Sequence, residues 1–166
     1  MTLKKQSQMP NQMPNQMPNQ MPDHTYPRAL AERLIRRHEG VRHKPYQDSV
    51  GKLTIGVGRN LTDRGLTPQE VNALFETDMR LAEQILTIWF EGWRTLSPSR
   101  QAALLSMAFN LGGPRLTGFV KLRRALGQQD FETAAKEALN SRWAKQVGKR
   151  ATHIAALLSG QEILNW

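Results

Sequence analysis

The chain has 166 residues, of which 39% are hydrophobic and 22% are charged. This length and this composition are both typical of one soluble globular domain. It contains no cysteine, which excludes a disulfide framework, a thiolate metal site and a cysteine nucleophile. Lys and Arg number 23 against 14 Asp and Glu, a net charge of +9 that implies polyanionic surroundings: nucleic acid, anionic lipid or a bacterial envelope.

The N-terminus, MTLKKQSQ, carries two lysines without an apolar segment behind them. It therefore does not have the pattern of a secretory signal. No apolar run approaches the ~20 residues that a membrane-spanning helix needs, so we expect no membrane anchor. Action outside the cytoplasm would then require another export route.

A four-residue repeat of Met-Pro-Asn-Gln follows from Gln8, and its last copy is altered. Proline at every fourth position removes backbone donors and prevents regular helix. We therefore predict an extended or disordered tail over residues 1–26, followed by a folded domain over residues 27–166. The tail is either a dispensable linker or a Met-rich segment that docks on a partner.

The predicted domain begins with a helix over Arg28–His38, in which Ala29, Leu30, Leu34 and Ile35 recur at helical spacing and Gly40 provides a stop. A turn at Asp48–Gly51 precedes a segment over Lys52–Gly58 in which apolar residues alternate, and this period of two predicts a strand in a small hairpin or meander.

After Gly65 the pattern is helical to the end of the chain. Thr67–Glu70 is a capping box with proline at the first helical position, and Ser97-Pro98 opens another helix that Asn110–Pro114 should break. In that second helix the spacing puts Ala102, Leu105 and Ala108 or Phe109 on one face. Further helices are predicted over Phe119–Leu126, Phe131–Asn140 and Arg150–Leu158. The fold class is therefore α+β: a helix, a small antiparallel sheet and a helical body.

Two carboxyl groups stand out as candidates for acid–base chemistry. Glu39 ends the first helix, and Asp48 lies nine residues later in the turn before the strand that carries Thr54. Glycoside hydrolysis requires a carboxylic acid that protonates the leaving oxygen and a carboxylate that stabilises positive charge or activates water. Spacing alone does not separate this pair from ordinary surface charges.

The wider segment is more specific. From Glu39 to Gly58 the chain reads EGVRHKPYQDSVGKLTIGVG, which resembles the active-site segment of the phage-type lysozymes (endolysins or muramidases, glycoside hydrolase family 24). Glu-Gly, a Tyr-x-Asp turn and Thr-Ile-Gly-x-Gly all occur in order and at the family's spacing. The resemblance covers about Leu30 to Gly160. Its later similar segments are Ala108–Gly112, Gly118-Phe119, Ser141–Trp143, Arg150-Ala151 and Gly160.

This resemblance implies a fold in which the small sheet forms one wall of a cleft and the helical body forms the other. It implies hydrolysis of the β-1,4 bonds between N-acetylmuramic acid and N-acetylglucosamine in peptidoglycan, without a cofactor or a metal. Glu39 would be the general acid, Asp48 would stabilise the transition state and help place a water, and Thr54 would hold that water. Asn60 and Phe109 match positions near the bound glycan, and Arg150 matches a basic residue close to the acid.

The chain departs from its relatives at Arg59-Asn60, after the last glycine of the strand motif, and at His38, where some relatives carry an acid that pairs with the basic residue at Arg150. Local pairing around these residues must therefore differ.

By the same resemblance we expect a monomer that is made in the host cytoplasm and acts in the periplasm or cell wall after release, with help such as that of a holin.

Other functions remain open on the sequence alone. A non-catalytic wall-binding module, a membrane-permeabilising basic protein and a nucleic-acid-binding domain would all suit the charge, although the intact Glu39, Asp48 and Thr54 favour an enzyme and we expect no nucleic-acid partner. The four histidines are scattered and predict no metal site. Trp89, Trp93 and Trp143 are predicted to lie in the core or at its edge, and the basic Lys145, Lys149 and Arg150 are predicted to form a solvated face.

Overall fold

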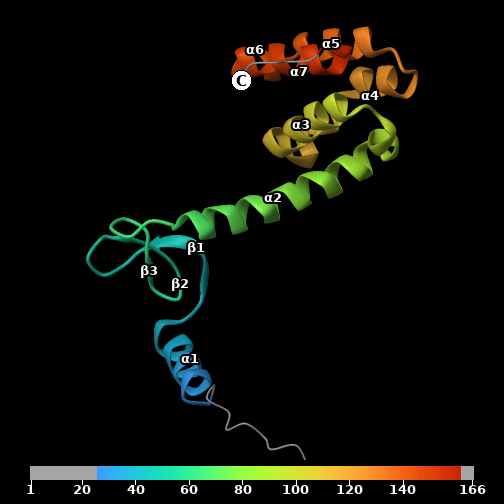
Figure 1. Cartoon of the computed structure of the whole chain (residues 1–166). Coiled ribbons are helices and arrows are strands. Elements are labelled where there is room, and N and C mark those ends of the chain that lie inside the picture. The colour runs from blue at the N-terminus through green and yellow to red at the C-terminus, as the bar shows by residue number, and fades with distance from the viewer. Residues whose placement is uncertain (1–25, 162–166) are drawn as a thin grey trace, which may run out of the picture. The chain divides into compact units, whose positions relative to one another are not determined.

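The computed structural model describes residues 26–161 and divides into two compact units, Met1–Gly65 and Leu66–Trp166, which are described separately (Figure 1). The predicted tail lies outside the described residues up to residue 25, as does Trp166. No helix among residues 26–161 combines the length and the apolar character that crossing a bilayer needs.

The first unit begins with α1, Tyr26–Glu39, which confirms the predicted helix and extends it at both ends. Arg36, Arg37 and His38 occupy the last turn, where positive charge complements the partial negative charge of the carbonyl end. Gly40 follows with φ +71°, a left-handed conformation that glycine adopts without a Cβ penalty. The helix therefore stops immediately after Glu39 and leaves that side chain at its end.

The predicted meander is present as a three-stranded antiparallel sheet in the order β1-β2-β3 (Figure 1). Its strands are β1 Arg42–Gln47, β2 Leu53–Gly56 and β3 Arg59–Asn60. The register of β1 against β2 shifts between Arg42 and Tyr46. Pro45 lies inside that irregular stretch of an edge strand, where a residue without an N–H is tolerated.

The second unit consists of helices, as the pattern after Gly65 predicts. Its α-helices are α2 Pro68–Trp89, α3 Pro98–Leu116, α4 Val120–Gly127, α5 Phe131–Leu139, α6 Arg142–Val147 and α7 Lys149–Ser159, and a 3₁₀ helix covers Glu91–Thr95. Together with the small sheet, these helices confirm the α+β class. The short helix α6 was not predicted, although Ser141 accepts a hydrogen bond from the Ala144 N–H and caps it.

Two local sequence signals in this unit are confirmed. The Thr67 hydroxyl accepts a hydrogen bond from the Glu70 N–H, and the Glu70 carboxylate accepts one from the Thr67 N–H, so the capping box is complete. The predicted break in α3 occurs at Gly112, whose φ of 66° and ψ of 169° are not helical. The backbone changes direction there, and Pro114 begins the following turn.

The core of the second unit takes buried side chains from all its α-helices and from the 3₁₀ helix, with Trp93 from the 3₁₀ helix and Trp143 from α6. In α3 the buried side chains are those of Ala103, Leu104, Met107, Ala108, Leu111 and Leu116. The predicted face is confirmed at Ala108, and Leu105 is partly buried against the core, whereas Ala102 and Phe109 are exposed. Phe109 is 43% exposed, because α3 packs on both α2 and α7 and buries the sides that face those two helices. The prediction for Trp89, Trp93 and Trp143 is confirmed, since all three are buried.

Candidate active site

Glu39 lies at the carboxyl end of α1, and its carboxyl group faces the turn between β2 and β3. A Cβ atom built on Gly58, in that turn, would lie 3.5 Å from Oε2 of Glu39. Gly58 has φ +74°, so both its conformation and the space beside it suit glycine. Within residues 26–161, no hydrogen bond or ion pair engages the Glu39 carboxyl. The side chain is therefore available to an external group.

Asp48 is held firmly in the turn between β1 and β2. Its Oδ1 accepts hydrogen bonds from the Val50 N–H at 3.0 Å and the Lys52 N–H at 2.8 Å. Its own N–H donates to the Lys52 carbonyl at 3.0 Å, and its carbonyl accepts from the Gly51 N–H at 3.1 Å. These bonds fix the orientation of the carboxylate and leave Oδ2 without a partner in the described part of the chain.

Thr54 occupies the central strand, where it pairs with Tyr46 of β1 and Asn60 of β3. It is 3% exposed and is the one polar or charged residue in the buried class among residues 27–161. Its hydroxyl donates to the Lys52 carbonyl at 3.2 Å, the same oxygen that accepts from the Asp48 N–H. One carbonyl therefore links the two residues, and the Thr54 oxygen retains lone pairs that can accept a further hydrogen bond.

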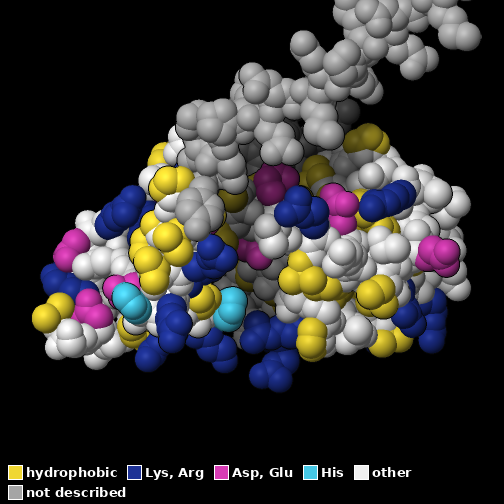
Figure 2. Space-filling model, turned by 90° about the horizontal axis from the view of Figure 1, so that it is seen from below, with side chains coloured by type: hydrophobic (Ala, Val, Ile, Leu, Met, Phe, Trp, Pro, Cys, Tyr) yellow, Lys and Arg dark blue, Asp and Glu magenta, His cyan; other side chains and the backbone are white. Residues whose placement is uncertain are grey.

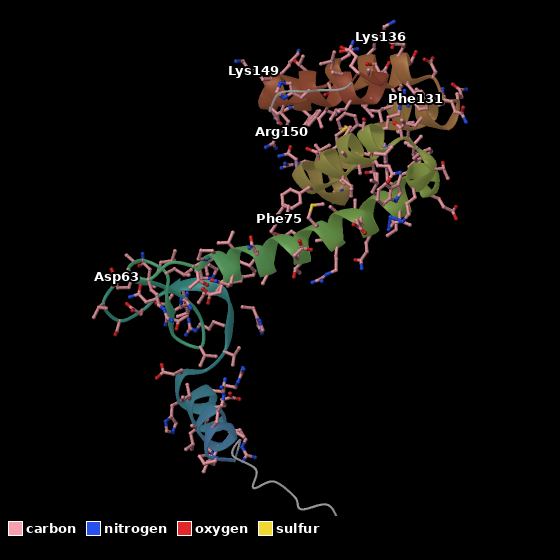
Figure 3. All side chains as sticks on the ribbon, in the orientation of Figure 1. Asp63, Phe75, Phe131, Lys136, Lys149 and Arg150 are labelled. Atoms are coloured by element: carbon pink, nitrogen blue, oxygen red, sulfur yellow. The ribbon has the colours of Figure 1, made fainter. Side chains whose placement is uncertain are left out.

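Asn60 lies beside Thr54 across the β2–β3 ladder, but its side chain is occupied within its own loop. Its amide donates to Oδ2 of Asp63 at 3.0 Å and accepts from the Asp63 N–H at 2.9 Å. Lys52 Nζ lies 2.9 Å from Oδ1 of Asp63, which Figure 3 labels. The hydrogen bond from Lys52, followed by that from Asn60, lowers the pKa of Asp63.

Lys52 and Asp63 were not predicted as site residues. Lys52 contacts three of these residues: its N–H and carbonyl hold Asp48, its carbonyl accepts from Thr54, and its ammonium holds Asp63 in the loop that carries Asn60. No sequence pattern identifies this role, because most of it comes from the backbone. Arg59, one of the departures from the family pattern, donates from Nε and Nη2 to the Gly65 carbonyl at 3.2 and 2.8 Å.

Phe109 belongs to the second unit and lies on α3. Its ring centroid is 5.7 Å from that of Phe75 on α2, which Figure 3 labels, with a tilt of 54° between the two planes. Both rings are partly exposed, 43% for Phe109 and 48% for Phe75, and offer an aromatic surface. The structure thus brings Asp48, Thr54 and Asn60 together on one sheet and places Glu39 against the Gly58 turn, whereas Phe109 is a feature of the helical unit.

The basic residues follow the prediction of a solvated face. Lys145, Lys149 and Arg150 are exposed, and the last two are labelled in Figure 3. Figure 2 shows Lys and Arg side chains distributed across the face in view.

Within residues 26–161, no group of three or more His, Cys, Asp or Glu side chains is arranged to hold a metal ion.

Comparison with known proteins identifies relatives over most of the chain. The family model described as "Phage lysozyme" matches residues 36–158. The chain is 30% identical over 158 residues to "Pre-baseplate central spike protein Gp5" of Enterobacteria phage T4; the match covers 78% of this chain and 27% of that protein. The chain therefore spans about a quarter of the spike protein's length.

Two further relatives are matched over most of their own length. "Probable T4-type lysozyme 2" of Dictyostelium discoideum is 23% identical over 157 residues, with 75% of this chain and 90% of that protein covered. "Endolysin" of Acyrthosiphon pisum secondary endosymbiont phage 1 is 30% identical over 121 residues, with 70% of this chain and 80% of that protein covered. The span that the family model matches includes all the candidate site residues, from Glu39 to Phe109.

Proposed function

The chain belongs to the phage lysozyme family, and from this we propose that it is an endolysin-type glycoside hydrolase that cleaves the β-1,4 bonds between N-acetylmuramic acid and N-acetylglucosamine in bacterial peptidoglycan. The observation that carries the proposal is one compact unit with three features. A glutamate that has no ion-pair or hydrogen-bond partner among residues 26–161 ends α1, a fixed aspartate lies in the β1–β2 turn, and a buried threonine lies on β2. All three lie in the segment that resembles the family's active site.

In the proposed mechanism Glu39 donates a proton to the glycosidic oxygen as the bond breaks. The nucleophilic water donates one hydrogen bond to the Thr54 oxygen and one to Oδ2 of Asp48. The Thr54 proton is already committed to the Lys52 carbonyl, so its oxygen is oriented to accept, and Oδ1 of Asp48 is occupied by two N–H groups. Both hydrogens of the water would then be bound, and its lone pair would be free to attack the anomeric carbon as the glycosidic bond breaks. The proton that the water loses would pass to Oδ2 of Asp48.

A water between the two carboxyl groups implies inversion at the anomeric carbon. We therefore propose a separation in the ~6.5–9.5 Å range of inverting glycosidases rather than the ~5–5.5 Å of retaining ones. The anomeric configuration of the first-formed product, followed by NMR, tests this part of the proposal. A retained configuration would contradict inversion and leave the roles of Glu39 and Asp48 to be tested separately.

Asn60 and Phe109 are proposed glycan contacts: Asn60 through the loop that Asp63 holds, and Phe109 through its exposed ring. We also propose that residues 27–166 act as one monomeric catalytic domain, that residues 1–26 are dispensable for the chemistry, and that the enzyme is made in the host cytoplasm. Its action would be in the periplasm or cell wall after release with the help of a holin, and host lysis would follow.

Glu39→Gln tests the central assignment, because the amide keeps the shape of the side chain and removes the proton. We expect glycan cleavage on purified peptidoglycan, followed by new reducing ends, to fall by roughly 10²–10⁴-fold, the usual contribution of a general acid. Glu32→Gln is the matched control, since Glu32 is an exposed glutamate on the same helix whose ion-pair partner in the described part of the chain is Arg28. Near-wild-type turnover by Glu39→Gln, with an unchanged thermal melt, would refute the assignment. Binding without cleavage by the wild type would indicate a wall-binding module instead.

A further inference from the structure

The Asn60 side chain is held by Asp63 in a way that permits one orientation of its amide. Its Nδ2 donates to Oδ2 of Asp63 at 3.0 Å, and its Oδ1 accepts from the Asp63 N–H at 2.9 Å. A backbone N–H can only donate and an ionised carboxylate can only accept, so a flipped amide would lose both bonds. Asp63 therefore determines where the nitrogen and the oxygen of the Asn60 amide lie.

Lys52 in turn holds the carboxylate of Asp63, which Figure 3 labels. Nζ of Lys52 lies 2.9 Å from Oδ1 of Asp63, the carboxylate oxygen that Asn60 does not use. The hydrogen bond from Lys52 is also the largest cause of the lowered pKa of Asp63, so the carboxylate stays ionised and remains an acceptor. Both side chains are partly exposed, and an exposed ion pair adds little to stability. Its main effect is to hold the acceptor that orients Asn60.

The Asn60 amide retains hydrogen-bonding capacity after these contacts. Its nitrogen carries a second hydrogen and its oxygen a second lone pair, since within residues 26–161 only one of each is used. Asn60 pairs with Thr54 across the β2–β3 ladder, so the two side chains lie on the same face of the sheet. The amide therefore has one free donor and one free acceptor on the face that carries the proposed water-binding threonine.

We propose that Lys52 and Asp63 are positioning residues that act through Asn60, holding its amide in the orientation that pairs with the 2-acetamido group of a bound sugar. This role rests on the proposed function, which supplies the ligand. An acetamido group has one N–H and one carbonyl oxygen, which match the free acceptor and the free donor of Asn60. A preference for N-acetylated over N-deacetylated strands then depends on the Lys52 ammonium, which acts through two other side chains.

Lys52→Met tests the positioning role, because it removes the ammonium and keeps the backbone N–H and carbonyl that hold Asp48 and Thr54. On purified peptidoglycan we expect KM to rise roughly tenfold while kcat changes by less than about twofold, since an oriented sugar contact is lost and the catalytic groups stay in place. Lys52→Arg keeps the cation and should restore a KM close to that of wild type. Glu32→Gln is the matched control, because it breaks an exposed ion pair elsewhere in the same unit.

N-deacetylated peptidoglycan, with chemically re-N-acetylated material as its control, tests the acetamido contact itself. The wild type should have a higher kcat/KM on N-acetylated strands, and Lys52→Met and Asp63→Ala should each lower this preference by roughly tenfold. The double variant should lower it no further than Asp63→Ala alone, because the two residues act in series. The net charge of +9 opposes cationic amino sugars to a similar degree in every variant, so it does not produce these differences.

Binding of a tetramer of N-acetylglucosamine to the full chain separates this role from the proposed function. We expect the NMR signals of the Asn60 side-chain amide to shift with this tetramer and not with a tetramer of glucosamine, and to shift less in Lys52→Met. An unchanged preference for N-acetylated strands in Lys52→Met, or losses of the same size in Glu32→Gln, would overturn the inference and leave the proposed function standing. Asn60 shifts with the N-acetylated tetramer, without any cleavage of peptidoglycan, would refute the proposed function and support the recognition.

Discussion

Thr54→Val separates the catalytic role of the Thr54 hydroxyl from its structural role. The valine side chain keeps the branched shape that the buried site accommodates and removes only the oxygen. Within residues 26–161 the hydroxyl makes one hydrogen bond, 3.2 Å to the Lys52 carbonyl, and that carbonyl also accepts from the Asp48 N–H at 3.0 Å. The substitution therefore leaves no acceptor without a partner, and the expected loss of stability is about 1 kcal/mol, near the value of one net hydrogen bond.

The effect on turnover should be much larger. Without the hydroxyl the attacking water loses one of its two proposed acceptors, and a misplaced nucleophile can cost roughly 100-fold in rate. The control is Thr54→Ser, which keeps the hydroxyl and removes a buried methyl group, also at about 1 kcal/mol. The two variants should therefore have similar melting temperatures, about 2–4 °C below wild type. Their rates of release of reducing ends from purified peptidoglycan should differ strongly.

The comparison has a clear refuting outcome. If Thr54→Val retains turnover close to that of Thr54→Ser, the hydroxyl does not position the water and serves only the turn. If both variants lose turnover and their melting temperatures fall by much more than about 2–4 °C, each substitution costs more stability than one hydrogen bond or one methyl group. The account of how Thr54 packs would then be wrong.

Three further predictions concern the fold and the tail. Leu104 is fully buried on α3, so Leu104→Ala should lower the free energy of unfolding by about 2–5 kcal/mol, measured by denaturant titration; a loss below 1 kcal/mol would mean that the helical core is not packed as described. The pKa of Asp63 is lower in the folded protein than its ordinary value of 3.8. The ionised carboxylate therefore stabilises the fold at pH values above the ordinary value, and this stabilisation is lost as the pH falls through the lower folded pKa. NMR signals of the Asn60 amide should therefore shift in that acid range in the wild type, whereas in Asp63→Asn they should not titrate there. Deletion of the chain before about Thr25 should leave turnover on purified peptidoglycan and the thermal melt unchanged, whereas a loss confined to intact cells would assign the tail to envelope targeting.

Local signals in the sequence determined much of the secondary structure. Proline near the start and glycine after the end set the limits of α1, alternation identified β2, and the Thr67–Glu70 capping box set the start of α2. These features depend on a few neighbouring residues, and so they are readable without the fold. The same applies to the Glu39–Gly58 segment that carries Glu39, Asp48 and Thr54, because its turn and its strand are also formed by residues close together in the sequence.

Contacts between distant residues were decided only by the tertiary structure. The buried face of α3 matches the predicted one only in part, because two neighbouring helices, α2 and α7, determine which sides are covered. The roles of Lys52 and Asp63 depend on a backbone carbonyl and on a salt bridge across eleven positions, and neither leaves a periodic pattern. A pocket lined by Trp143 is formed where α3, α4, α5 and α6 meet. Periodicity reports the neighbours of a residue along one helix or strand, whereas these features depend on which elements meet, and that is fixed only when the whole core packs.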